Sequence, residues 1–198
     1  DFYSDSTRTY LSGSQENRAY SPLNLYMALS SLAECCGGES REQILDLMKA
    51  DSIDELRTQA GRVWNANYCD DGALKSLLAG SVWLSSDVGY SQSVLDSLAE
   101  NYYTSAHVGD FGTEQMNRSI RNWLSKQTGG FLEDAVGDVA PDADTVLALY
   151  STVYFKGRWD QTFDPNRTES RTFHAPSGDI QREFMSQGGY RDYYWGEE

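Results

Sequence analysis

The chain has 198 residues, of which 39% are hydrophobic, 13% aromatic and 23% charged, and no apolar run is long enough to span a membrane. This length and composition predict an ordinary globular chain with one sizeable core or two small ones. The formal net charge of -14 repels phosphate backbones and anionic lipid surfaces at long range, so we expect neither nucleic acid nor a membrane as a partner, while basic or neutral proteins remain open.

The first strong signal is a helix start at Ser21-Pro22. The serine oxygen can accept a hydrogen bond from a free amide, and proline at the first helical position loses nothing by lacking its N–H. Residues 23–33 leave almost no polar face, which indicates a helix buried on nearly every side. Gly37-Gly38 is expected to end this helix.

Two capping boxes predict the next two helices. Ser40 with Gln43 opens a short amphipathic helix, and Ser52 with Glu55 opens another. In each box the serine oxygen is expected to accept from the backbone amide three residues later.

Strands and helices alternate in the middle of the chain. Residues 80–84 predict a short apolar strand, and residues 92–103 place their apolar side chains on one helical face. Residues 106–111 predict another strand. Thr113 then opens a helix whose buried stripe consists of Met116, Ile120, Trp123 and Leu124.

The run Leu147–Phe155 is the most informative segment of the chain. Its residues are apolar, aromatic or β-branched almost without interruption until Lys156-Gly157 ends the pattern. This predicts a long strand that is buried on both faces. Beyond it, the turn at Pro176–Asp179 between alternating segments predicts a hairpin-rich tail.

Several of these segments resemble, in the same order, motifs of the serpin family. Leu147–Trp159 resembles the serpin segment leucine-x-asparagine-alanine-x-tyrosine-phenylalanine-lysine-glycine-x-tryptophan, which forms a central strand of the main sheet, and Thr128–Leu132 resembles threonine-x-glycine-x-isoleucine. Cys35-Cys36 depart from the family's glycine-alanine. The ordered set runs from Asn17 to Tyr190 and is far more specific than any one motif.

The resemblance implies an α+β fold with helices packed around a large, mainly antiparallel central sheet. Because a serpin domain is nearly twice this length, residues 1–198 would be the N-terminal portion of a single domain, without its reactive loop and C-terminal strands. We expect a secreted, extracellular protein, with the cytoplasm as the alternative.

The implied function is inhibition of a serine or cysteine protease as a suicide substrate. The target protease cuts the reactive loop, which inserts into the central sheet as an extra strand and distorts the acylated protease before the ester can hydrolyse. Val146–Phe155 would be the strand beside which the loop inserts, or else a plain core strand. The implied partners are the target protease and a C-terminal fragment of the same protein, with no cofactor or metal and no enzymatic activity. A non-inhibitory serpin acting as carrier, chaperone or storage protein is the alternative, which bulky, charged or proline residues in the loop hinge would favour.

The resemblance also indicates four candidate sheet-opening residues. Ser21 matches a serpin serine beneath the sheet centre, where polar residues hold the strands until they part. The family usually has a second serine and a strand asparagine where this chain has Asn24 and Ser151. Such an exchange preserves one amide and one hydroxyl in a buried cluster, and two independent substitutions are the alternative. Trp159 matches the tryptophan that serpins keep where insertion begins, or else is an ordinary core aromatic.

A third class of function would use a cysteine as nucleophile. Cys35, Cys36 and Cys69 are odd in number and lack metal-ligand spacing with His107 or His174. We interpret them as small buried hydrophobes. A hydrolase would require one of them to meet a histidine, and a thiol-reactive probe would reveal it.

Overall fold

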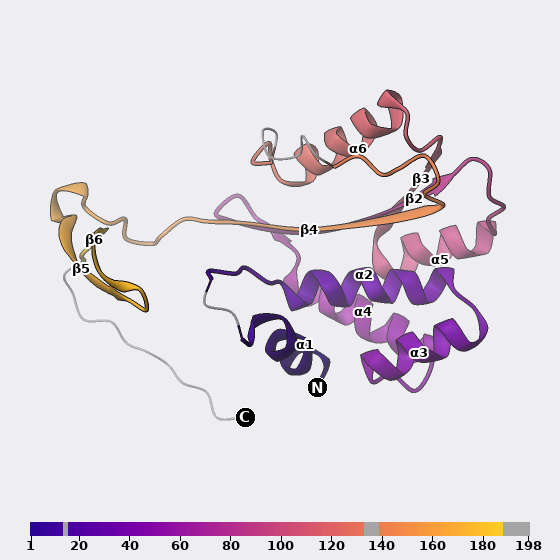
Figure 1. Ribbon diagram of the computed structural model, residues 1–198, viewed down its shortest axis with the longest axis horizontal. Coiled ribbons are helices and arrows are strands. Elements are labelled where there is room, and N and C mark those ends of the chain that lie inside the picture. Colours follow the sequence, from indigo (N-terminus) through magenta and orange to yellow (C-terminus); the bar gives the residue numbers. More distant parts are fainter. Residues whose placement is uncertain (14–15, 133–138, 188–198) are drawn as a thin grey trace. The chain divides into compact units, whose positions relative to one another are not determined.

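The structure, a computed structural model, describes residues 1–13, 16–132 and 139–187 and divides the chain into two units, residues 1–157 and 158–198. Figure 1 shows the elements of both units. The described helices of the first unit are α1 (Phe2–Leu11), α2 (Pro22–Cys35), α3 (Gly38–Met48), α4 (Ile53–Asn67), α5 (Gln92–Tyr102) and α6 (Glu114–Gln127). Its described strands are β1 (Cys69–Asp70), β2 (Leu74–Ser85), β3 (Thr104–Gly109) and β4 (Leu147–Gly157). None of the described helices is long and apolar enough to cross a bilayer.

The predicted helix starts at Ser21, Ser52 and Thr113 are confirmed, and the one at Ser40 is wrong. The Ser21 hydroxyl accepts from the Asn24 amide at 3.2 Å, and Ser52 does the same for α4. The Ser40 capping box is wrong, because α3 already begins at Gly38. Glycine tolerates the φ of 55° found there, so the chain turns directly from α2 into α3 and Ser40 lies inside the helix.

The sheet is built around β2. Along one edge β2 pairs antiparallel with β4 over eleven residue pairs, from Leu74 opposite Gly157 to Leu84 opposite Leu147. Along its other edge it pairs antiparallel with the short β1 and parallel with β3. Helix α5 joins β2 to β3, as a parallel connection requires. The predicted α+β fold is confirmed, with this parallel pair inside a mainly antiparallel sheet.

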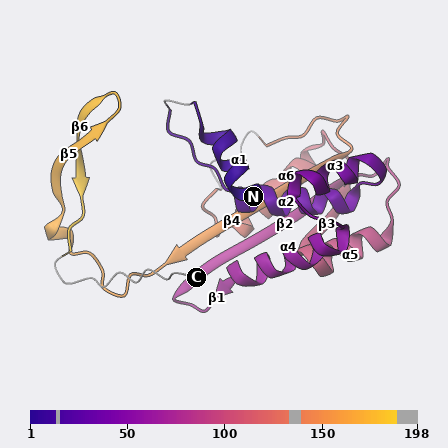
Figure 2. The same ribbon diagram turned by 90° about the horizontal axis from the view of Figure 1, so that it is seen from below.

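Helices cover both faces of the sheet (Figures 1 and 2). Helices α1 to α5 form one core against the sheet, in which Val82 and Leu84 of β2 are buried and Leu149 of β4 packs against them. Helix α6 forms the other core, where Trp83 of β2 is buried and Tyr150 of β4 packs alongside. The alternation of these side chains along β2 and β4 follows the period of two of a strand.

The prediction that Leu147–Phe155 is buried on both faces is wrong. The side chains of Leu147 to Ser151 are half-buried, while Phe155 is 69% exposed. Figure 1 shows why, since the C-terminal part of β4 runs beyond α2 and α6. Burial along this strand therefore depends on which elements cover it and not on the apolar sequence alone.

The second unit contains the predicted hairpin. Its strands are β5 (Glu169–Ala175) and β6 (Gly178–Phe184), which pair antiparallel after a short 3₁₀ turn at Pro165–Arg167. Gly178, with a φ of 121°, follows the two-residue connection between the strands. Tyr190, where the ordered set of serpin-like motifs ends, lies outside the described residues.

Candidate functional site

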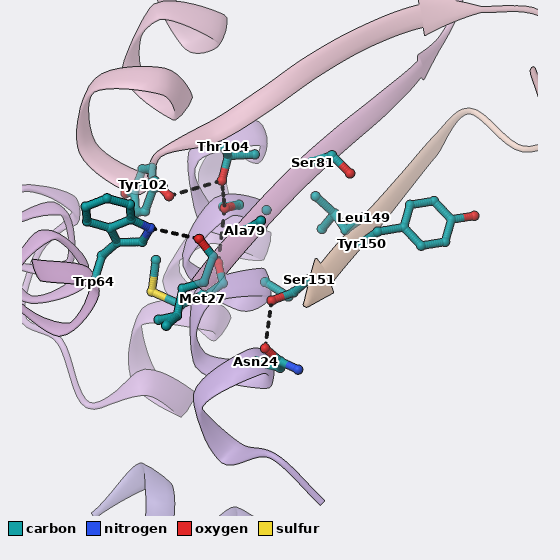
Figure 3. A pocket seen from close by; sticks show the side chains of 14 residues that line it. Asn24, Met27, Trp64, Ala79, Ser81, Tyr102, Thr104, Leu149, Tyr150 and Ser151 are labelled. Carbon is teal, nitrogen blue, oxygen red and sulfur yellow. Dashed lines mark hydrogen bonds between the residues drawn. The ribbon is translucent and has the colours of Figure 1, made fainter. Parts of the chain in front are cut away.

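Three of the four candidate residues lie together between α2 and β4. The Ser151 hydroxyl donates to the Asn24 Oδ1 at 3.2 Å, across 127 positions of sequence (Figure 3). Ser21 caps the same turn of α2. Asn24 and Ser151 are both half-buried. The predicted hydrogen bond is thus present, while its role in sheet opening stays a prediction.

A second bond joins α2 to the opposite strand of the sheet. The hydroxyls of Ser31 and Thr104 lie 3.2 Å apart, and each residue is only 3% exposed. Ser31 is two helical turns beyond Asn24, so both project from one face of α2. Sequence reasoning missed this bond, although the seven-residue spacing of two polar residues in an apolar helix is a signal that could have found Ser31.

The strand partners of both bonds belong to one row across the sheet. Gly80 of β2 lies opposite Ser151 of β4 and opposite Thr104 of β3. A Cβ at Gly80 would lie 2.7 Å from the Thr104 Oγ1, closer than side-chain contacts allow. The row therefore requires glycine in the middle strand, and two hydroxyls flank it.

A small cavity lies inside this polar row (Figure 3). Its volume of about 10 Å³ is close to the minimum that holds one water molecule, and Asn24, Ser31 and Ser151 contribute to its lining. Beside it, the indole N–H of Trp64 donates to the Leu78 carbonyl at 3.1 Å. This bond satisfies a carbonyl on the stretch of β2 that separates its β1 and β3 pairings.

Helix α2 is fixed to its neighbouring helices by a buried ion pair. Glu34, whose side chain is 4% exposed, accepts from the Arg57 guanidinium at 2.6 and 3.0 Å and from the Tyr102 hydroxyl at 3.1 Å. Burial alone would raise the pKa of Glu34, but these hydrogen bonds and the Arg57 charge outweigh burial and hold the pKa below its ordinary value of 4.5. The sheet thus faces a helix that is tied to both α4 and α5.

The sequence pattern of the family described as Serpin (serine protease inhibitor) matches residues 2–198. The chain belongs to the serpin family. Serpin-ZX of Arabidopsis thaliana is 26% identical over 167 residues, which make up 82% of this chain and 43% of that protein. Among solved structures, Arabidopsis AtSerpin1 in its native stressed conformation matches with a TM-score of 0.80 at 24% sequence identity. The match covers 93% of this chain and 49% of the AtSerpin1 chain. Human thyroxine-binding globulin matches with a TM-score of 0.78 at 19% sequence identity, and the match covers 93% of this chain and 51% of the globulin chain.

This serpin chain spans less than half the length of Serpin-ZX. The two solved structures are each less than 25% identical in sequence to this chain, and their similarity supports the serpin fold. That residues 1–198 are the N-terminal portion of a single domain stays a prediction.

The fourth candidate, Trp159, belongs to the second unit of the serpin chain. Its side chain is 63% exposed and its ring meets that of Phe163 edge to face, with centroids 5.4 Å apart. Trp159 is thus an exposed side chain in the part of the chain that the structure describes, and its alternative as a core aromatic of the complete protein stays open. Its place at the start of loop insertion stays a prediction.

The contacts of the two histidines, His107 and His174, are with side chains other than cysteine. The His107 ring stacks on Trp83 and bonds Ser105, and His174 bonds Asp179. Burial lowers the pKa of His107. The cysteines, Cys35, Cys36 and Cys69, are free and half-buried, so they are less buried than the sequence interpretation expected, although Cys35 packs against the core.

Proposed function

We propose that the complete protein carrying this chain inhibits a serine or cysteine protease by loop insertion. The observation that carries this proposal is the outer edge of β4. In the described residues β4 pairs with β2 alone, so its other edge presents a row of backbone amides and carbonyls to a further strand. An additional strand along this edge would gain ladder hydrogen bonds and cover the half-buried side chains of β4.

Loop insertion makes the uncut protein metastable. Before cleavage the sheet has room for a strand that the intact loop cannot fully supply, and after cleavage the strand inserts and translocates the acylated protease. The Asn24–Ser151 bond lies at the strand next to the insertion path. In this proposal it holds the closed sheet until cleavage supplies the new strand.

The proposal includes the partners and place of action. The target protease is the main partner, and a C-terminal segment of the same protein completes the sheet beside β4. The protein acts as a substrate once and not as an enzyme, and it works outside the cell. Recovery of the native protein only from the cytoplasmic fraction of its source cells would contradict the extracellular part.

A non-inhibitory carrier is the second candidate. The likeness to human thyroxine-binding globulin, a protein that by its name binds thyroxine, supports this candidate. The two candidates differ in what happens when the reactive loop is cut.

The test compares melting curves of uncut and loop-cleaved complete protein. We expect cleavage to raise the melting temperature, because the inserted strand adds ladder bonds and buried side chains beside β4. An ordinary domain gains nothing from a cut in a loop. An unchanged or lower melting temperature after cleavage would favour the carrier.

A further inference from the structure

We propose that the Ser31–Thr104 bond is a second latch on sheet opening, although Thr104 lies two strands away from the edge that opens. The proposal rests on the loop-insertion function and assigns Ser31 and Thr104 as positioning residues for it. Its basis is the way in which β2, β3 and β4 are bound to each other and to α2.

The three strands are bound more firmly to one another than to α2. Separating β4 from β2 would break an eleven-pair ladder. It would also divide the α6 core, because Trp83 of β2 and Tyr150 of β4 both pack in it. When a new strand enters beside β4, the smaller disruption is to move β4, β2, β3 and α6 together across α2.

Such a movement displaces both hydroxyl contacts at once. Ser151 and Thr104 flank Gly80 in one row, and their partners Asn24 and Ser31 project from one face of α2. A shift of the row relative to the helix therefore lengthens both bonds. The bond on β3 opposes opening at β4 because β2 connects the two strands.

The second latch can part without leaving a buried hydroxyl without an acceptor. The Ser31 Oγ lies 3.1 Å from the Met27 carbonyl oxygen in its own helix. The Thr104 Oγ1 lies 3.3 Å from the carbonyl oxygen of Tyr102, two residues earlier at the end of α5 (Figure 3). Each hydroxyl can donate to that carbonyl when the other moves away. The two hydroxyls carry two protons, so only two of these three bonds exist at one time, and opening replaces the bond between the hydroxyls by a bond to a carbonyl without leaving an unsatisfied polar group.

The test measures how fast the uncut complete protein converts to the latent, loop-inserted form on warming. Ser31→Ala and Thr104→Val each remove one member of the latch with little change in volume. We expect each variant to convert up to about twofold faster than wild type, because opening exchanges one hydrogen bond for another and loses only part of the free energy of one bond. The double variant should convert no faster than the faster single variant, because both changes remove the same bond.

Ser30→Ala is the matched control. Ser30 is fully buried in the same helix, and its hydroxyl donates to the Tyr26 carbonyl at 2.8 Å within α2. We expect its conversion rate to equal that of wild type, because its bond does not change when the strands move.

Two results would overturn the latch. One is conversion of Ser31→Ala and Thr104→Val at the rate of Ser30→Ala, and the other is a double variant whose acceleration equals the product of the two single effects. Failure of the proposed function has a different signature, in which cleaved wild-type protein melts no higher than uncut protein and no variant converts. That outcome overturns both proposals, whereas a stabilised cleaved protein with unchanged conversion rates overturns the latch alone.

Discussion

Replacing Arg57 by methionine is expected to destabilise the protein strongly and to alter its response to acid. Arg57→Met keeps much of the side-chain length but removes the two guanidinium donors that contact Glu34 at 2.6 and 3.0 Å. The Glu34 carboxylate would then remain buried, 4% exposed, with its charge no longer balanced. Breaking a buried ion pair from one side destabilises proteins by about 3–5 kcal/mol.

The structure points to the lower end of that range. The Arg57 side chain is 30% exposed, so water can approach the position that the guanidinium leaves, and Tyr102 still donates to the carboxylate. We therefore expect a loss of about 3 kcal/mol in the free energy of unfolding at pH 7. That is a large share of the roughly 5–15 kcal/mol that stabilises a typical domain.

The pH dependence provides a second and independent signature. In wild type the folded-state pKa of Glu34 lies below 4.5, so its contribution to stability is complete above pH 4.5 and is lost as the pH falls through the folded-state value. In Arg57→Met, burial would raise the folded-state pKa of Glu34, so the folded variant binds a proton more readily than the unfolded chain. The stability difference between the two proteins should therefore begin to shrink above pH 4.5, as Glu34 of the variant binds a proton, and shrink further below pH 4.5, as wild type loses its contribution.

The assay is urea unfolding of uncut wild-type and variant proteins at several pH values between neutrality and acid. Asp54→Asn is the matched control, because it removes the other carboxylate that pairs with Arg57. The Asp54 Oδ1 lies 2.6 Å from an Arg57 guanidinium nitrogen, and the Asp54 side chain is 83% exposed. An exposed ion pair contributes about 0–1 kcal/mol. Equal losses in Arg57→Met and Asp54→Asn, or a stability difference that does not change with pH, would refute the reasoning.

Three further substitutions test the sheet-opening site. Ser151→Ala removes the donor to half-buried Asn24 and should lower the free energy of unfolding by about 1 kcal/mol, measured in urea; unchanged stability would show that the bond adds nothing. Gly80→Ala places a Cβ 2.7 Å from the Thr104 Oγ1 and should destabilise the protein by about 1–3 kcal/mol in the same assay, with a neutral result contradicting the close approach. Trp159→Ala in the complete protein should hasten conversion of the uncut form to the latent form, seen by a rise in melting temperature with time, and a wild-type rate would remove Trp159 from the insertion path.

Local sequence rules predicted the helices well because the relevant interactions are close in sequence. The Ser21 and Ser52 caps bond amides three residues away. The predicted stripe of α6 is buried as a whole, since a period of 3.6 residues places one side of the helix against the sheet. In contrast, β2 was predicted only at residues 80–84 and extends over Leu74–Ser85. Its first half is a strand because β4 pairs with it, which no local pattern reveals.

The candidate site depends more than the helices do on contacts between residues that are far apart in sequence. Ser31 and Thr104 are 73 positions apart, and their bond requires the register of β2 with β3. Asn24 and Ser151 were connected only through the resemblance to serpins. From the residues alone, each would be an isolated polar side chain in an apolar segment. Pairing across elements carries the information that the one-dimensional pattern lacks.

In the proposed opening, the polar row would be the part of the sheet that moves across α2. Large apolar side chains interdigitate, and sliding them past one another would disrupt many contacts at once. At the row, glycine occupies β2, small hydroxyl side chains flank it, and two directional bonds hold it to α2. A few hydrogen bonds can break and re-form at low barriers, whereas the apolar cores on either side keep the strands in register. If the sheet opens as we propose, small polar residues here would combine a defined closed state with a low-energy route for opening.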